Sequence, residues 1–275
     1  MLSVEGLLKR FHGVDAVCDV SFAVAPGEIV GLVGASGSGK STIARCILGL
    51  EKPDAGLIRY DDAVLTDRAG RRAARRAIQA VFQDPRSSLN PRWTVRRILS
   101  EPLGTWFDRE PPSLRMARLQ ALLGQVTLSV DLLARYPHEL STGQCQRLCV
   151  ARALACGPNL LVLDEPLSAL DVSVQARMLA MLRALHAAGG PSYLLITHDF
   201  AVVREICHRV LVLDKGRIVE TGPMAQVLDT PSHPVTRALL LDALPLPFET
   251  VAIEGGGADL TEPAFDDATA GARSP

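Results

Sequence analysis

The sequence predicts an α/β protein whose core is interrupted by a helical insert. Three continuous apolar runs in the second half have the length and composition of buried parallel strands. These runs are residues 160–163, 193–196 and 209–213, and helical segments separate them. Residues 87–157, by contrast, have mostly helical periodicity. We therefore expect the core to consist of residues 1–86 and 158–222, with the insert between its two halves.

The first half of the core is expected to begin with a β-rich subdomain. Short runs there alternate between apolar and polar residues or are continuously apolar, as strands do, and Pro26-Gly27 marks a turn between two of them. The candidate strands are residues 3–7, 20–24, 28–33, 57–60 and 77–82. In the insert, residues 114–123 and 144–155 have the strongest helical patterns.

Composition limits the class of protein. The chain has 275 residues, of which 48% are apolar, so it can bury a substantial core. Its net charge of −1 and aromatic content of 4% argue against nucleic acid as a partner. No apolar run approaches the length that crosses a bilayer, and no signal segment opens the chain, so a cytoplasmic location is expected. Six cysteines without a C-x-x-C pair are expected to be free, buried and reduced.

Residues 34–41 read Gly-Ala-Ser-Gly-Ser-Gly-Lys-Ser, directly after strand 28–33 and before a helical pattern over 42–50. The glycines let the backbone curl so that successive N–H groups cradle phosphate oxygens, and the helix start adds its dipole. Lys40 can reach the β- and γ-phosphates, and the Ser41 hydroxyl can hold Mg²⁺. A Gly/Ser-rich loop with a chance lysine is the alternative, which the flanking strand and helix disfavour. The candidate nucleotide contacts are Gly34, Ser36, Gly37, Ser38, Gly39, Lys40, Ser41 and Thr42.

Polar side chains follow three predicted strands at the edge where the phosphate loop also lies. Asp164 ends the run 160–163 and can hold Mg²⁺, and Glu165 can act as the base or orient an attacking water. His198, after 193–196, can bond the γ-phosphate and steady the water or Glu165, and Gln83 can sense Mg²⁺ or the water. The alternative is that the acids only cap a strand before a proline and that the histidine is structural. The candidate metal ligands are therefore Ser41, Gln83 and Asp164.

A second potential anion site opens the helix at residues 144–155. The sequence Leu140-Ser141-Thr142-Gly143-Gln144 places a serine and a glycine at a helix N-terminus, where backbone N–H groups are free. We call this potential anion site, residues 140–144, the second cup, the first being the phosphate loop. One chain has little need of two such cups for one triphosphate. Two chains packed head to tail could each close this cup over the nucleotide of the other.

Together these motifs resemble those of the ATP-binding cassette (ABC) ATPases, over about residues 2–245. The resemblance implies a P-loop NTPase core with a β-rich N-terminal subdomain and an inserted helical subdomain. It also implies that ATP and Mg²⁺ are the cofactors. The family motifs match Gly34–Ser41 (Walker A), Gln83 (Q-loop), Leu140–Gln144 (signature), Asp164 and Glu165 (Walker B and catalytic glutamate), 168–171 (D-loop) and His198 (switch histidine).

Two further positions bear on that resemblance. Phe11 lies near the place where the family stacks an aromatic ring on adenine, although a core phenylalanine is an alternative. Thr142 departs from the family's Leu-Ser-Gly-Gly-Gln. A threonine there is harmless if its φ is negative and obstructive if its φ is positive. Ser141, Gly143 and Gln144 are retained, so a working cup is expected.

Three stretches are similar to the dipeptide, oligopeptide and nickel import subfamily: residues 81–91, 94–102 and 233–240. This resemblance implies an ATPase subunit that works with a second ATPase subunit beneath membrane permeases. A substrate-binding protein would supply the cargo, and no nucleic acid would take part. The chain would then lie on the inner face of the cell membrane as a peripheral protein. The alternative is an accessory ATPase of a soluble phosphonate-cleaving complex.

The resemblance also divides the chain. Residues 1–222 would form the ATPase domain, and residues 223–250 a short C-terminal extension of the oligopeptide-transporter type. From residue 251 the chain is rich in Gly, Ala, Asp and Glu, which predicts a disordered tail over 251–275.

Overall fold

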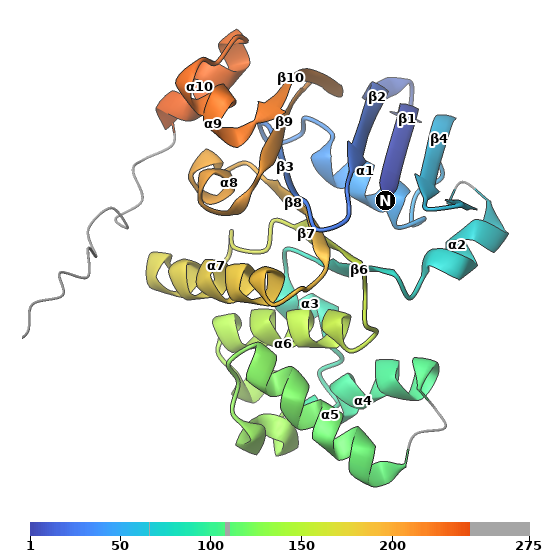
Figure 1. Ribbon diagram of the computed structural model, residues 1–275, viewed down its shortest axis with the longest axis vertical. Helices are drawn as coiled ribbons and strands as arrows, with labels where there is room; N and C mark the ends of the chain where they lie inside the picture. Colours follow the sequence, from blue (N-terminus) through green and yellow to red (C-terminus); the bar gives the residue numbers. More distant parts are fainter. Residues whose placement is uncertain (66, 108–110, 243–275) are drawn as a thin grey trace, which may run out of the picture. The chain divides into compact units, whose positions relative to one another are not determined.

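Two β-sheets with an α-helix between them form the centre of the computed structural model, which describes residues 1–65, 67–107 and 111–242 (Figure 1). Contacts group these described residues into one compact unit. The predicted tail 251–275, and the end of the predicted extension 223–250, lie outside the described residues.

The larger sheet carries the predicted parallel strands. In the described part of the chain its order is β10 (Arg217–Pro223), β9 (Arg209–Asp214), β3 (Ile29–Val33), β8 (Ser192–Thr197), β7 (Leu160–Asp164) and β6 (Ile78–Val81). All neighbouring pairs are parallel except β9 and β10. Every residue of β3, β7 and β8 is buried, which explains why these strands are continuous apolar runs. The carboxyl ends of the parallel strands therefore meet at one edge.

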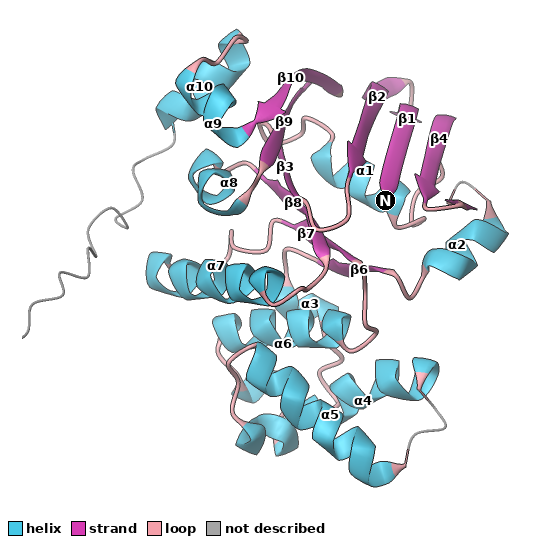
Figure 2. Cartoon of the chain, viewed as in Figure 1, coloured by secondary structure: helices cyan, strands magenta, loops and turns pink. Residues whose placement is uncertain are grey.

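The smaller sheet is antiparallel and forms the predicted β-rich subdomain. Its order is β2 (Val14–Val24), β1 (Leu2–Phe11), β4 (Ala55–Tyr60) and β5 (Ala63–Val64). Helix α1 (Lys40–Ile47) lies between the two sheets (Figure 2). Its buried Ile43 and Ile47 share one apolar core with Leu7 of β1 and with Leu32 of β3.

Helices cover the opposite face of the larger sheet and share a second core with it. The helices of the insert and those after it are α3 (Pro85–Ser88), α4 (Val95–Trp106), α5 (Pro112–Gln125), η1 (Val130–Ala134), η2 (Pro137–Glu139), α6 (Thr142–Leu154), α7 (Val172–Ala187) and α8 (Phe200–Ile206). A short helix α2 (Arg68–Ala74) precedes β6, and α9 (Met224–Asp229) and α10 (Pro234–Asp242) follow β10. All elements in the described part of residues 87–157 are helices, as the sequence predicts.

Two sequence expectations need correction. The helix predicted over residues 42–50 ends at Ile47, because Gly49 has a φ of +67° and breaks the helical path. The six cysteines are free thiols, but only five are buried, since Cys18 on β2 is half-buried.

Glu220 fastens the segment after β10 to the sheet. Its carboxylate accepts hydrogen bonds from the backbone N–H groups of Ser232 (2.8 Å) and His233 (3.0 Å) and from the hydroxyls of Ser232 and Thr236. Burial opposes ionisation, but these hydrogen bonds outweigh it and lower the pKa of Glu220 to about 2. Glu220 is therefore charged, and its carboxylate holds the start of α10 in place.

Candidate active site at the carboxyl edge of the sheet

The phosphate loop joins β3 to α1, and its glycines are required by the backbone path. A Cβ at Gly34 would lie 2.2 Å from the carbonyl oxygen of Leu213, and one at Gly39 would lie 2.3 Å from that of Ala16. Gly37 and Gly39 have φ values of +79° and +109°. L-residues with a side chain rarely adopt these values, so the loop depends on glycine for its tight curl.

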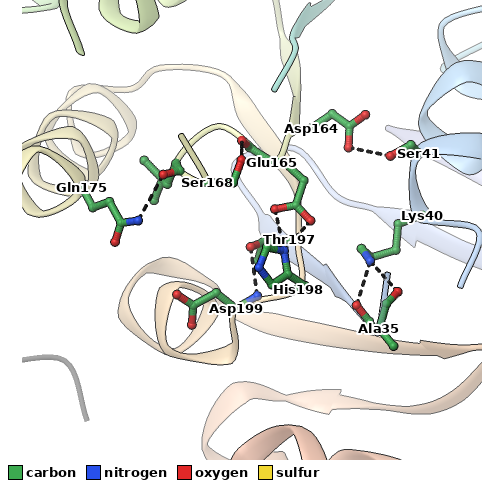
Figure 3. A network of polar contacts seen from close by, with 12 residues as sticks. Ala35, Lys40, Ser41, Asp164, Glu165, Ser168, Gln175, Thr197, His198 and Asp199 are labelled. Atoms are coloured by element: carbon green, nitrogen blue, oxygen red, sulfur yellow. Dashed lines mark hydrogen bonds and ion pairs between the residues drawn. The ribbon is translucent and has the colours of Figure 1, made fainter. Parts of the chain in front are cut away.

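Lys40 points back over this loop from the first turn of α1 (Figure 3). Its Nζ donates hydrogen bonds to the carbonyl oxygens of Gly34 (2.7 Å) and Ala35 (2.9 Å). The residue is 6% exposed, and burial lowers its pKa, while the nearby Glu165 and Asp164 act in the opposite direction. The buried hydroxyl of Ser38 has no hydrogen-bond partner among the described residues. An ammonium on weak carbonyl acceptors and an unpaired hydroxyl are the donors that a phosphate group satisfies.

Ser41 and Asp164 form a pair of oxygen ligands beside the loop. The Ser41 hydroxyl donates to Oδ1 of Asp164 at 3.1 Å. Burial raises the pKa of Asp164, and the hydrogen bond from Ser41 opposes that rise. In the described part of the chain, no three His, Cys, Asp or Glu side chains gather as a metal cage. One carboxylate and one hydroxyl suit Mg²⁺, which prefers few protein ligands plus substrate phosphates and water, so the donor set fits this ion.

Glu165 and His198 each follow the last residue of neighbouring parallel strands, β7 and β8. The Nδ1 atom of His198 lies 2.9 Å from Oε1 and 3.0 Å from Oε2 of Glu165 (Figure 3). The Glu165 side chain is 12% exposed and that of His198 is 59% exposed. A carboxylate beside an imidazole, on the edge that carries Lys40, can accept a proton from a water molecule bound there.

The backbone of Glu165 is strained. Its φ is +51°, in the left-handed region, which costs a residue with a Cβ about 1 kcal/mol or more. Its N–H donates to the carbonyl oxygen of Ile196 at 2.9 Å, and its own carbonyl accepts from the Ser168 hydroxyl at 3.1 Å. These bonds to β8 and to the following turn hold Glu165 in this conformation and aim its side chain at His198.

Gln83 and Phe11 make no hydrogen bond with these groups among the described residues. Gln83 is exposed just after β6, and no hydrogen bond links it to Ser41 or Asp164 in the part of the chain that is described. Phe11 is 37% exposed at the end of β1, with the Nζ of Lys9 4.9 Å from its ring centre. The role predicted for each stays a prediction.

The second cup starts helix α6 and is built by reciprocal capping. The Ser141 hydroxyl accepts from the N–H of Gln144 at 3.2 Å, and Oε1 of Gln144 accepts from the N–H of Ser141 at 2.8 Å. Thr142 is the first helical residue and has no positive φ, so the condition for a harmless threonine is met. A Cβ at Gly143 would lie 2.6 Å from Cγ1 of Val174, which explains the glycine there.

Residues 141–144 are not joined to the phosphate loop. Among the described residues, no hydrogen bond connects these residues with residues 34–42. The sequence-predicted groups therefore divide into one assembled set at the sheet edge and one separate cup on α6.

Sequence analysis missed Gln175, which supports the turn after Glu165. Its Nε2 donates to the carbonyl oxygens of Leu167 (3.1 Å) and Leu170 (3.2 Å). It also overlooked Thr197, whose hydroxyl oxygen accepts from the N–H of Asp199 (3.1 Å) at the turn that carries His198. For Thr197 the available signal was a polar residue at the end of an apolar strand, whereas Gln175 lies among other polar residues of α7 and had no such signal.

The comparisons with known proteins agree on a family. The family model described as ABC transporter matches residues 17–168. A putative peptide import ATP-binding protein of Brucella ovis is 46% identical over 90% of this chain and 79% of that protein. The oligopeptide transport ATP-binding protein OppF of Escherichia coli is 45% identical over 84% of this chain and 70% of its own length. The nickel import ATP-binding protein NikE of Rhodospirillum rubrum is 45% identical over 87% of this chain and 86% of its own length.

Solved structures resemble the fold in the same way. The dimeric post-hydrolysis structure of the ATP-binding cassette MJ0796, bound to ADP and Pi, has a TM-score of 0.73 and 28% identity over 82% of this chain and 99% of that one. The structure of cbiO1 from Clostridium perfringens, part of the ABC transporter complex cbiONQ, has a TM-score of 0.75. It is 28% identical and covers 83% of this chain and 90% of its own. The chain is thus an α/β P-loop ATPase. It belongs to the ABC transporter family, as one of its ATP-binding cassettes.

Proposed function

We propose that this chain is the ATP-hydrolysing subunit of an importer that takes up peptides, nickel or metal chelates through a membrane permease. The observation that carries the proposal is the convergence of Lys40, the Ser41–Asp164 pair and the Glu165–His198 pair on one sheet edge. The import names of the relatives support the cargo class. No observation favours the phosphonate-cleaving alternative.

The triphosphate would lie in the loop of residues 34–42. Its β- and γ-phosphates would take over the Lys40 ammonium from the Gly34 and Ala35 carbonyls and would pair the Ser38 hydroxyl. Ser41 and Asp164 would hold Mg²⁺, with Gln83 as a further ligand, and Phe11 would stack on the adenine. When bound, Mg²⁺ supplies positive charge that stabilises the transferring phosphoryl group.

Glu165 and His198 would act on the attacking water. The Glu165 carboxylate would accept the proton of that water as the water attacks the γ-phosphate in line. His198, held by Glu165 at 2.9 Å, would contact the γ-phosphate and keep the water in place. Because positioning and charge stabilisation supply most of the rate, an incomplete site should be nearly inactive.

A second cassette would complete the site. Ser141, Thr142 and Gly143 present helix N-terminal N–H groups, yet they bond nothing in the phosphate loop of their own chain. We infer that they meet the γ-phosphate held by a second ATPase subunit, of the same or a different sequence. The neighbour MJ0796 is described as dimeric, which supports this arrangement.

A groove between the core and the insert would receive the permease. It has a volume of ≈ 380 Å³ and lies between β6, α4 and the end of α6. Leu50 and Trp106, which are 62% and 36% exposed, line it together with Glu101 and Arg152. Exposed apolar side chains with a few charges at the rim are typical of a docking surface. A substrate-binding protein would act only through the permease.

No helix in the described part of the chain is long and apolar enough to span a membrane. We propose that the subunit works from the inner face of the cell membrane, held there by the permease.

The experiment that tests the proposal is nucleotide binding by the full chain followed by turnover with its transporter. Wild-type protein should bind Mg-ATP, and Lys40→Ala should lose that binding by about 100-fold because the phosphates lose their buried cation. In proteoliposomes with the permease and the second cassette, the rate of ATP hydrolysis should rise and fall with the rate of cargo uptake. Binding that is indifferent to Lys40, or hydrolysis with no uptake of any peptide, nickel or metal-chelate cargo, would refute the proposal.

A further inference from the structure

A hydrogen bond connects the segment after Gln83 with the residue before Ser141. Nη2 of Arg86, in the short helix α3, donates to the carbonyl oxygen of Leu140 at 3.2 Å. The turn that carries Arg86 is capped by Asp84, whose Oδ1 accepts from the N–H of Arg86 at 2.9 Å. The guanidinium of Arg86 therefore extends from a capped helical turn, and the cap residue Asp84 directly follows Gln83.

The peptide group between Leu140 and Ser141 is held on both sides. Its carbonyl accepts from Arg86, and its N–H donates to Oε1 of Gln144 at 2.8 Å. The Ser141 hydroxyl is fixed in turn by the N–H of Gln144. A peptide plane with both groups bonded cannot rotate without breaking one of them, so Arg86 and Gln144 together set the orientation of Ser141.

Other contacts hold α3 on α6 without Arg86. Sγ of Cys149 lies 3.7 Å from the carbonyl oxygen of Pro85, and Nη1 of Arg152 donates to the carbonyl oxygen of Ser88. Both contacts are about two to three turns further along α6 than Ser141. Loss of the Arg86 side chain should therefore leave the two helices packed and release only the start of α6.

The charge of Arg86 also bears on the cup. α6 has no acidic residue in its first turn, and the Arg86 cation lies near enough to this turn to lower the pKa of the Cys145 thiol against the larger rise from burial. A cation at the positive end of a helix dipole is unfavourable on its own. The arrangement becomes favourable when an anion lies at the same end, because cation and dipole then act together.

We propose that Arg86 is a positioning residue for the cup of Ser141 and Gly143, acting through the Leu140 carbonyl. It links the orientation of Ser141 to the segment after Gln83, beside the proposed permease groove. The inference rests on the proposed function, since the cup would act on the nucleotide of a second cassette. Arg86 itself touches neither nucleotide nor water in this scheme.

The test compares Arg86→Leu, Arg86→Lys and the control Arg92→Leu. Arg92 is an exposed arginine of the same segment whose side chain makes no hydrogen bond or ion pair with the described residues. Each full chain is assayed alone for Mg-ATP binding, and with its second cassette and permease in proteoliposomes for kcat and KM. Thermal unfolding reports whether each variant is folded.

We expect Arg86→Leu to lower kcat about tenfold, because Ser141 would no longer be held in the orientation that meets the γ-phosphate of the second cassette. Mg-ATP affinity of the chain alone should stay within twofold, Arg86→Lys should recover part of kcat, and Arg92→Leu should match wild type. A normal kcat for folded Arg86→Leu would overturn the inference. So would a loss of Mg-ATP binding equal to the loss of turnover, since that indicates a general structural role. If the wild-type complex neither binds nor hydrolyses ATP, the proposed function itself fails, a result distinct from these.

Discussion

The Nδ1 atom of His198 lies 2.9 Å from Oε1 of Glu165, although 33 residues separate them. Sheet register explains the contact. Asp164 pairs with Ile196 across β7 and β8, so the residues that follow these parallel strands emerge side by side. The left-handed φ of Glu165 then turns its side chain toward the imidazole. The pair is a product of the parallel sheet and of one strained residue.

Replacing Glu165 by Gln should separate binding from chemistry. The amide keeps the size of the side chain but cannot accept a proton from water, so Mg-ATP should still bind while turnover falls at least 100-fold. Phosphate release by the reconstituted complex measures the loss. Glu205→Gln, in an ion pair with Arg183 away from this edge, is the control. Near-normal turnover by Glu165→Gln would contradict the role proposed for this residue.

Replacing Ser41 by Ala should change the magnesium requirement. The substitution removes one oxygen ligand and the hydrogen bond that the Ser41 hydroxyl donates to Asp164. We expect the Mg²⁺ concentration for half-maximal hydrolysis to rise about tenfold, with part of the rate recovered at high Mg²⁺. A magnesium titration checks this, with Ser3→Ala on β1 as a serine control. An unchanged titration would remove Ser41 from the ion site.

Replacing Thr142 by Gly should have little effect on hydrolysis. Thr142 is helical and has no positive φ, so its side chain does not strain the cup. Restoring the family's usual glycine should leave ATPase activity of the assembled complex within twofold and lower helix stability by less than about 1 kcal/mol. A several-fold rise in activity would show that the threonine obstructs the cup.

Replacing Gly143 by Ala should disturb the same cup through its neighbour. The new Cβ would lie 2.6 Å from Cγ1 of Val174, so the Val174 side chain or the backbone around it must shift. We expect a loss of about 1–3 kcal/mol of unfolding free energy and a marked loss of hydrolysis. The double variant Gly143→Ala/Val174→Ala removes the clash and should recover stability, which thermal and denaturant unfolding can measure. Failure of this rescue would place the cause elsewhere.

Replacing Glu220 by Gln should loosen the start of α10. The native carboxylate has a pKa lowered to about 2 from an ordinary 4.5, so it stabilises the fold fully above about pH 4.5. That contribution should be lost as pH falls from about 4.5 to about 2. At pH 7 the variant should lose about 1–2 kcal/mol of unfolding free energy or show local protease sensitivity near residue 232. Equal acid sensitivity of wild type and variant between pH 4.5 and 2 would contradict the assignment.

Much of the assembled edge was predictable because its parts are local motifs at strand ends. The phosphate loop needs only glycines at given positions between a strand and a helix, and residues 34–41 supply them. The carboxyl ends of parallel strands share one edge, so Asp164, Glu165 and His198 were expected near Lys40. Contacts between helices were not predictable, since the link from Arg86 to Leu140 joins carbonyl and guanidinium groups that carry no sequence pattern.

The order of residues over short stretches of the sequence was sufficient to specify the chemistry. These stretches are a glycine loop with Lys40, two acids after a buried strand, and a serine cap before a helix. Such features depend on residue type and short spacing, which the folded state does not alter. Only the folded chain decided that Glu165 contacts His198 and that Ser141 is held from α3 while lying apart from its own phosphate loop. Those relations depend on sheet register, a left-handed residue and helix packing, which arise from contacts between residues distant in sequence.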